Sequence, residues 1–368
     1  SQELLSEFVD EGLAPPGHEL RHLLNAVWQA SDYSITGVQL GEEVRLSGFL
    51  HVDQELLESS QQQVLASLQG DSTFLDRVPR EAILAASGNV DFGALVQGML
   101  AEDSDAEESD LDAVRNLTRG MFLGLDLFDE VLPALGPQFG FYLVPEEKPE
   151  LDDEIAPAWV AGVQTRSIPG RSGPSVSEAL QNGLKTFMNL AAGFLKEQGQ
   201  DPEEVRVTTS KVDGVDVTSL EGVKVWPEYV VATVAAVEDF VMLGTSREAV
   251  VNSLRVKPEE SLGRCDRFRK AMAAGLERPS QVIYIDCQRM REVIENNGDA
   301  VLSAVVQTRR LDEDAARRSL DQLNGVIALA DHLLAAVRFE DAGIAYGVTF
   351  TMDDAEDESQ EEIAGAAR

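Results

Sequence analysis

Hydrophobic and polar residues alternate in two widely separated stretches, and this pattern predicts a β-hairpin in each. The first hairpin is expected over residues 32–53 and the second over residues 331–353, and both end in aspartate. Residues two apart share one face of a strand, so each hairpin has an apolar face suited to a core. The matching apolar positions are Val44, Leu46, Leu50 and Val52 in the first, and Ile344, Tyr346, Phe350 and Met352 in the second.

Helical periodicity and strand-like runs fill the chain between the hairpins. Pro15-Pro16-Gly17 interrupts a helical stretch over residues 1–28, and Asp91 and Ser246 are placed to begin further helices. The other helices are expected at 53–68, 111–132 and 176–196. The other strands are expected at 82–87, 139–144, 159–165, 205–212, 215–220, 229–237, 240–244 and 281–286.

Two parts of the chain share an order of elements. Leu75-Asp76-Arg77-Val78-Pro79 leads into the strand 82–87, Leu276-Glu277-Arg278-Pro279 leads into the strand 281–286, and a helix follows each strand. Together with the similar hairpins, this indicates weak internal repetition at a spacing of roughly 200 to 300 residues. We therefore expect an α+β fold of two related units, each a curved, mainly antiparallel sheet covered by helices.

The expected boundaries follow from two acidic segments. Residues 1–145 would hold the end of one unit and the start of the next, and residues 157–352 would form the C-terminal α+β portion. Residues 353–368 are acidic and then small, so we expect a frayed tail.

The charge of the chain restricts its partners. The 65 acidic residues outnumber the 30 basic residues, giving a net charge of −35 and a pI near 4.3. Such a surface repels nucleic acid and anionic lipid. No run of eighteen apolar residues occurs, so no transmembrane segment is expected. A protein or an envelope component is the expected partner, and the sequence leaves the oligomeric state open.

Four stretches resemble a family of exported, uncharacterised proteins of planctomycete-type bacteria. They are residues 78–91, residues 131–141, residues 240–250 and the closing hairpin. The resemblance implies a periplasmic or envelope location and an α+β repeat. It carries no known catalytic residues, so none is transferred to this chain.

The segment His18-Glu19-Leu20-Arg21-His22 matches H-E-x-x-H, in which two histidines bind zinc and the glutamate activates a water. One interpretation is a zinc metallopeptidase with His18 and His22 as ligands and Glu19 as base. The setting favours an exposed helix face instead, because Pro15-Pro16-Gly17 places His18 at the start of its helix and no third histidine follows three residues later. We therefore expect no metal, cofactor or catalytic residue, with the zinc site kept as the alternative.

The other candidate motifs also favour structural roles. The acidic run 102–108 lacks the glycine of an EF-hand loop, and the loop 167–174 lacks the G-K-[ST] of a phosphate loop. His51 and His332 fall on strands without a recognisable nucleophile motif nearby. Cys265 and Cys287 are expected to be buried thiols, with a single disulfide as the alternative.

These observations favour a non-enzymatic exported or envelope protein that acts as a binding or scaffold module. The zinc peptidase at residues 18–22 is one alternative. The other is a cation-dependent surface or lattice component.

Overall fold

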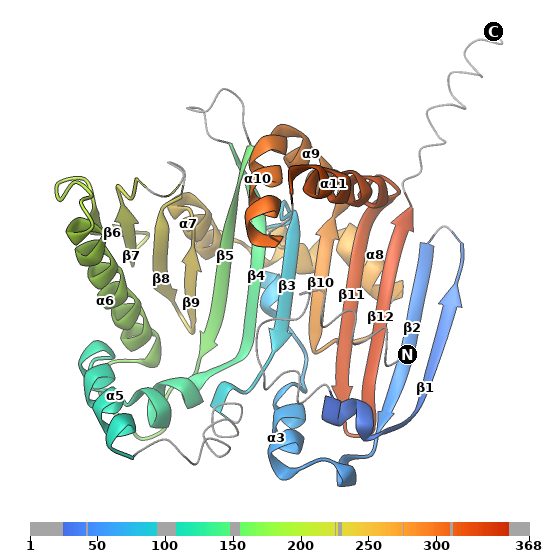
Figure 1. Cartoon of the computed structure of the whole chain (residues 1–368). Helices are drawn as coiled ribbons and strands as arrows, with labels where there is room; N and C mark the ends of the chain where they lie inside the picture. The colour runs from blue at the N-terminus through green and yellow to red at the C-terminus, as the bar shows by residue number, and fades with distance from the viewer. Residues whose placement is uncertain are drawn as a thin grey trace.

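A single antiparallel sheet runs through the whole molecule (Figure 1). The computed structural model describes residues 25–41, 43–93, 108–147, 155–224, 226, 230–274, 276–309 and 312–352. Within them the sheet has twelve strands in the order β1-β2-β12-β11-β10-β3-β4-β5-β9-β8-β7-β6. The strands are β1 Ser31–Gln39, β2 Glu43–Val52, β3 Leu84–Asn89, β4 Leu135–Glu147, β5 Ile155–Thr165, β6 Arg206–Val212, β7 Val215–Glu221, β8 Ala232–Val237, β9 Phe240–Gly244, β10 Gln281–Asp286, β11 Ala330–Glu340 and β12 Gly343–Met352.

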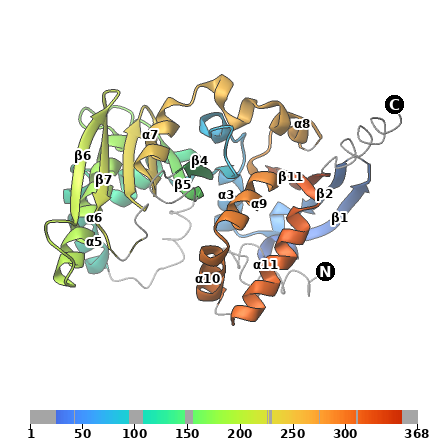
Figure 2. The same cartoon turned by 90° about the horizontal axis from the view of Figure 1, so that it is seen from above.

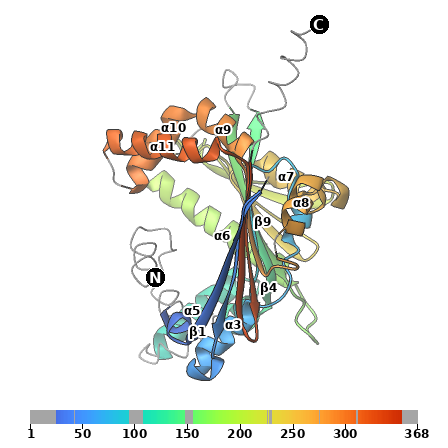
Figure 3. The ribbon, with the colours of Figure 1, turned by 90° about the vertical axis from the view of Figure 1, so that its right-hand side faces the viewer.

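Helices lie on both faces of this sheet, as the edge-on view and the view from above show (Figures 2 and 3). Helices α6, α10 and α11 lie on one face, and α7 and α8 lie on the other. The helices are α3 Ser59–Ser67, α5 Glu108–Met121, α6 Val176–Glu197, α7 Arg247–Arg255, α8 Asp266–Ala274, α9 Cys287–Asn296, α10 Gly298–Arg309 and α11 Glu313–Ile327.

Side-chain caps fix where several of these helices begin. The hydroxyl of Ser175 accepts from the backbone N–H of Glu178, and the carboxylate of Glu178 accepts from the backbone N–H of Ser175. Ser246 is the N-cap residue of α7, and Asp286 is the N-cap residue of α9. Each cap satisfies backbone donors that have no partner inside the helix, which is worth about 1 kcal/mol.

The main core lies between the centre of the sheet and the layer that contains α7 and α8. Tyr142 of β4 and Tyr284 of β10 are almost completely buried there. Phe74 has no exposed surface and lies over Gly140 of β4 and Gly162 of β5, which face each other across the two strands. Burying a side chain of this size stabilises the fold by roughly 1.5 to 3 kcal/mol.

The expectation of two units with separate sheets is wrong. The antiparallel pair β3–β10, next to the middle of the sheet, joins the two regions that the sequence predicted to be independent. Outward from it, β4 and β5 follow on one side and β11 and β12 on the other. The hairpin β8–β9 is added to β5, whereas the hairpin β1–β2 is added to β12. Strands β3 to β9 come from the continuous stretch 84–244, whereas β1, β2, β10, β11 and β12 combine residues 31–52 with residues 281–352. The ladder between β3 and β10 joins these two groups into one sheet, so they do not form separate sheets. The α+β class and the antiparallel pairing are confirmed.

Most predicted elements are present, with shifted ends. Both hairpins and strand β10 lie where the alternation predicts them. Strand β3 begins two residues later than predicted, at Leu84. The helix expected over 111–132 ends at Met121, because Leu123 and Gly124 adopt φ values of 55° and 85° that no helix accepts.

Candidate functional site

A charged groove opens beside the core, between α7, α9 and the loop that precedes β3. Its volume is about 860 Å³. Val144 and Pro145 of β4 are among its apolar lining. Its charged lining comprises Arg80, Glu81, Glu248, Arg255, Glu260, Arg289 and Glu292.

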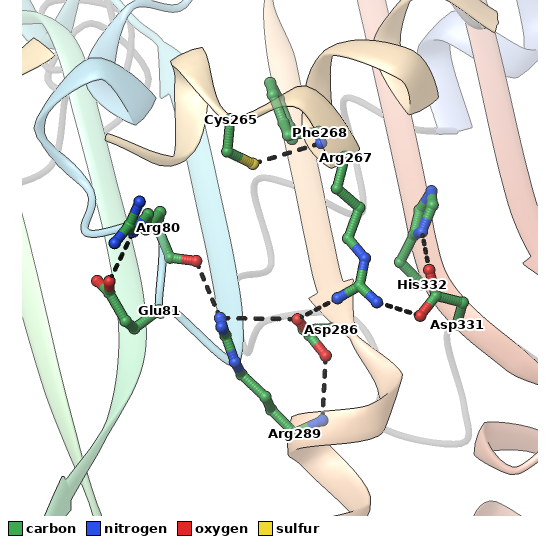
Figure 4. Close-up of polar contacts among 9 residues, drawn as sticks. All are labelled: Arg80, Glu81, Cys265, Arg267, Phe268, Asp286, Arg289, Asp331 and His332. Carbon is green, nitrogen blue, oxygen red and sulfur yellow. Dashed lines mark hydrogen bonds and ion pairs between the residues drawn. The ribbon is translucent and has the colours of Figure 1, made fainter. Parts of the chain in front are cut away.

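The buried carboxylate of Asp286 organises one side of this groove (Figure 4). Asp286 is the last residue of β10 and the N-cap of α9, so it lies where a strand turns directly into a helix. Its Oδ1 accepts a 3.0 Å hydrogen bond from the backbone N–H of Arg289, and its Oδ2 accepts a 2.8 Å bond from Nη1 of Arg267. The guanidinium of Arg289 lies 3.7 Å from the same carboxylate.

Arg267 of α8 connects three elements through two carboxylates. One guanidinium nitrogen pairs with Asp286 of β10 and the other with Asp331 at the start of β11. Burial lowers the pKa of Arg267, but Asp286 and Asp331 outweigh that effect and the net change is upward. Arg267 therefore remains charged and holds α8 against the sheet.

Further polar contacts continue from Asp331 to His332 and Thr351. Nδ1 of His332 lies 3.2 Å from the Asp331 carboxylate, and Nε2 lies 2.9 Å from the hydroxyl of Thr351. Carboxylate, imidazole and hydroxyl in this order resemble a base that activates a nucleophile. His332 is only 4% exposed and packs against the ring of Tyr284, so the groove does not reach it. This arrangement fixes the end of the hairpin.

Each arginine that lines the groove has a partner within the chain. Nη1 of Arg289 donates to the carbonyl of Arg80 at 2.9 Å, and Nε of Arg80 lies 2.9 Å from Glu81. Arg255 pairs with Asp213 at 2.7 Å. Of the described residues that line the groove, none is histidine, cysteine, serine or tyrosine. The three arginines of the groove are thus each held by a partner within the chain.

The two cysteines are free thiols, so the alternative of a disulfide between them is not found. Burial, together with Asp286 and Asp331, raises the pKa of the Cys287 thiol to about 11. At neutral pH it is therefore protonated and a poor nucleophile.

The predicted zinc ligands His18 and His22, with Glu19, lie outside the residues that the structure describes, as do residues 102–107 of the acidic run and the tail 353–368. In the described part of the chain no group of three or more His, Cys, Asp and Glu side chains is arranged to hold a metal. The zinc site stays a prediction, which metal analysis of the purified chain and of a His22→Ala variant tests.

Sequence reasoning missed the polar network around Asp286. Pairing of β10 with β11 brings Asp286 close to Asp331, and Arg267 reaches both carboxylates from α8. The contact of His332 with Thr351 is local to the predicted hairpin. The register of β11 and β12 places these two residues opposite each other.

The edge strand β1 is a second candidate surface. It forms one edge of the sheet (Figure 1), and residues Asp32–Gln39 are all exposed. Its apolar side chains have exposed fractions of 49% for Tyr33, 65% for Ile35 and 64% for Val38. The one charged residue of β1, Asp32, lies 2.6 Å from Nδ1 of His51, and the ring of Tyr33 stacks on His51.

The opposite edge strand, β6, is different. Arg206 and Lys211 place two positive charges on it, paired with Glu221 and Asp216 of β7. Helix α6 also packs on β6 and its neighbours. Charges and covering elements are the usual protection of a sheet edge against pairing with another chain. Strand β1 has neither a lysine nor a proline.

Within the residues that the structure describes, these features define an α+β protein with one large antiparallel sheet, a charged groove and an open sheet edge. The chain belongs to a protein family of unknown function, DUF3352, whose family model matches residues 38–316. The resemblance to an uncharacterised family is therefore confirmed, whereas nothing in the match supports a planctomycete-type source. No curated protein and no solved structure matches the chain. None of the described helices is both long enough and apolar enough to cross a membrane.

Proposed function

We propose that this chain is a non-enzymatic binding or scaffold module of the cell envelope, and that β1 is its binding edge. The observation that carries the proposal is the contrast between the two sheet edges: β6 bears Arg206 and Lys211, whereas β1 bears exposed Tyr33, Ile35 and Val38. An open edge presents unpaired backbone N–H and C=O groups, to which an extended segment of another chain can add as a further strand.

The described groups of the groove support a binding role over a catalytic one. Three arginines of the groove each have a partner within the chain: Arg80, Arg255 and Arg289. These side chains are therefore held in fixed positions. The lining of the groove comes from β4, α7, α9 and neighbouring loops and includes no residue of β1.

The envelope location is part of the proposal. It is supported by the acid-rich composition, with 65 acidic against 30 basic residues, and by the resemblance to exported proteins. Fractionation of a bacterium that carries the natural gene, with an antibody against this chain, tests it. Recovery in the cytoplasmic fraction alone would refute the location.

A synthetic peptide with the sequence of β1, Ser31–Gln39, is a suitable probe for strand addition. We expect the fluorescein-labelled peptide to bind the full chain, as measured by fluorescence anisotropy. A second peptide carries aspartate in place of Ile35. The Ile35→Asp variant of the chain should bind this second peptide at least roughly tenfold more weakly than the unmodified chain does, because the two aspartates oppose each other.

Leu56→Asp is the matched control for this experiment. Leu56 is 68% exposed, close to the 65% of Ile35, but it lies in the short 3₁₀ helix η1 (Gln54–Leu56), outside the edge strand. The control variant should bind the peptide like the unmodified chain. Equal loss in both variants would mean that binding depends on exposed hydrophobic surface in general.

A further inference from the structure

The sequence of β1 is complementary to itself in one antiparallel register. Strands related by a two-fold axis perpendicular to the sheet keep their faces, so residues of one face oppose residues of the same face. With Ile35 opposite Ile35 of a second copy, the regular stretch Tyr33–Gly37 pairs without interruption, and the bulge between Ser31 and Tyr33 lies outside it. Tyr33 then opposes Gly37 twice, and Ser34 opposes Thr36 twice.

This register sets Tyr33 opposite Gly37, and when the Tyr33 ring turns from His51 toward the second copy it forms an aromatic–glycine pair of a kind that the sheet already contains. Tyr346 of β12 opposes Gly48 of β2, and its ring lies directly over that glycine. Phe139 of β4 covers Gly88 of β3 in the same way. An aromatic side chain over a glycine fills the gap that the missing side chain leaves and stabilises the pairing.

Hydroxyl pairs across strands also occur within the molecule. Thr209 of β6 and Thr218 of β7 lie 3.1 Å apart through their Oγ1 atoms, and Ser219 of β7 lies 3.0 Å from Thr233 of β8. The pairs of Ser34 with Thr36 in the register centred on Ile35 are of the same kind. Such cross-strand pairs contribute to sheet stability.

Charge favours this edge for contact between two copies. A net charge of −35 makes two copies repel each other over most of their surfaces. Strand β1 carries only one charged residue, Asp32, which pairs with His51 and lies at the bulge between Ser31 and Tyr33, outside the regularly paired stretch. No like charges within β1 oppose each other there.

We propose that two copies of this chain associate through their β1 strands, in the antiparallel register centred on Ile35, to form one continuous sheet. This inference rests on the proposed function, because it names a second copy as the occupant of the same binding edge.

Charge reversal at Ile35 tests the pairing and its register together. We expect the unmodified chain to form a dimer of twice 40.0 kDa at high micromolar concentration in sedimentation velocity runs. Ile35→Asp and Ile35→Lys should each weaken dimerisation at least roughly tenfold, because the substituted residues oppose each other. Mixing the two variants should restore a dimer. Leu56→Asp should dimerise like the unmodified chain.

Crosslinking measures the register directly. Opposed residues of an antiparallel pair have Cα atoms about 4.5 to 5.5 Å apart, which a disulfide can bridge. Oxidised Ile35→Cys should therefore give a covalent dimer, and Leu56→Cys should not. Ser34→Cys should crosslink poorly alone but readily when mixed with Thr36→Cys, because these two positions oppose each other.

The outcomes separate the inference from the proposed function. A chain that stays monomeric but binds the β1 peptide at its β1 edge would refute the second copy and leave strand addition standing. A chain that stays monomeric and does not bind the peptide would refute both. A dimer that survives Ile35→Asp would place the contact elsewhere and refute the β1 pairing.

Discussion

At the scale of the residue, the buried carboxylate of Asp286 fills several structural roles at once. It is 2% exposed, ends a strand, caps a helix and holds Arg267. Hydrogen bonds to charged groups contribute about 1.5 to 3 kcal/mol each, and a buried donor left without a partner costs a similar amount.

We predict that Asp286→Asn destabilises the fold by about 2 to 3 kcal/mol, because an amide can cap α9 but cannot neutralise Arg267. Urea denaturation followed by circular dichroism measures the change. Asp299→Asn, at an exposed position in the first turn of α10, should cost no more than a few tenths of a kcal/mol. Equal effects of the two substitutions would show that the contacts of Asp286 add nothing.

Asp126 gives a residue-scale prediction that depends on pH. Burial alone would raise its pKa, but the backbone N–H groups of Asp129 and Phe128 and the guanidinium of Arg119 outweigh burial and lower the pKa below 3.8. A carboxyl group with a lowered pKa in the fold stabilises it above its unfolded pKa. That stability is lost as the pH falls through the folded value.

We therefore expect Asp126→Asn to cost about 1 kcal/mol at neutral pH, since asparagine keeps the cap but not the charge. The difference from the unmodified chain should stay constant down to the ordinary pKa of 3.8 and shrink below it. Paired urea titrations across that range measure it. A difference that grows on acidification would contradict the prediction.

At the scale of the element, close packing over glycines makes the central strands sensitive to added volume. The ring of Phe74 occupies the space that a side chain at Gly140 would need. We predict that Gly140→Ala destabilises the fold by about 1 to 3 kcal/mol, because a well-packed core resists one more methyl group. The midpoint of thermal unfolding should fall accordingly.

The matched control is Gly193→Ala in α6. Gly193 is exposed, no atom lies within 4 Å of an added side chain, and alanine favours a helix over glycine by up to about 1 kcal/mol. The same chemical change should therefore stabilise the protein there. Destabilisation at both sites would argue against the packing explanation.

The elements themselves were largely predictable from local pattern. Alternation in β2 and β12 and helical periodicity in α6 are short-range properties, and the structure has all three close to the expected bounds. The sheet order was not predictable, because the pairings of β3 with β10 and of β2 with β12 depend on contacts between distant segments. The Asp286 network escaped prediction for the same reason, and the exposure of β1 was not predicted either.

At the scale of the whole molecule, the excess of acidic residues acts on the entire fold. With a net charge of −35, the compact state brings like charges together. Raising the salt concentration from about 0.01 M to 0.15 M shortens the screening length from about 30 Å to about 8 Å. We predict that the melting temperature rises over this range, as differential scanning calorimetry measures.

Sodium and calcium chloride at equal ionic strength separate screening from specific binding. Equal increases are the expected result. A larger increase with calcium, together with calcium-dependent light scattering, would favour the alternative of a cation-dependent lattice component.

The addition of the first hairpin to the last strand has a consequence for the time course of folding. About 290 residues separate His51 from its partner Gly343, and a ribosome adds about 5 to 20 residues per second. Strand β2 therefore waits on the order of 15 to 60 s before β12 exists. During that interval both sides of the β1–β2 hairpin lack neighbours from the final sheet. A newly made chain is thus most exposed to aggregation at the hairpin that we propose as its binding edge.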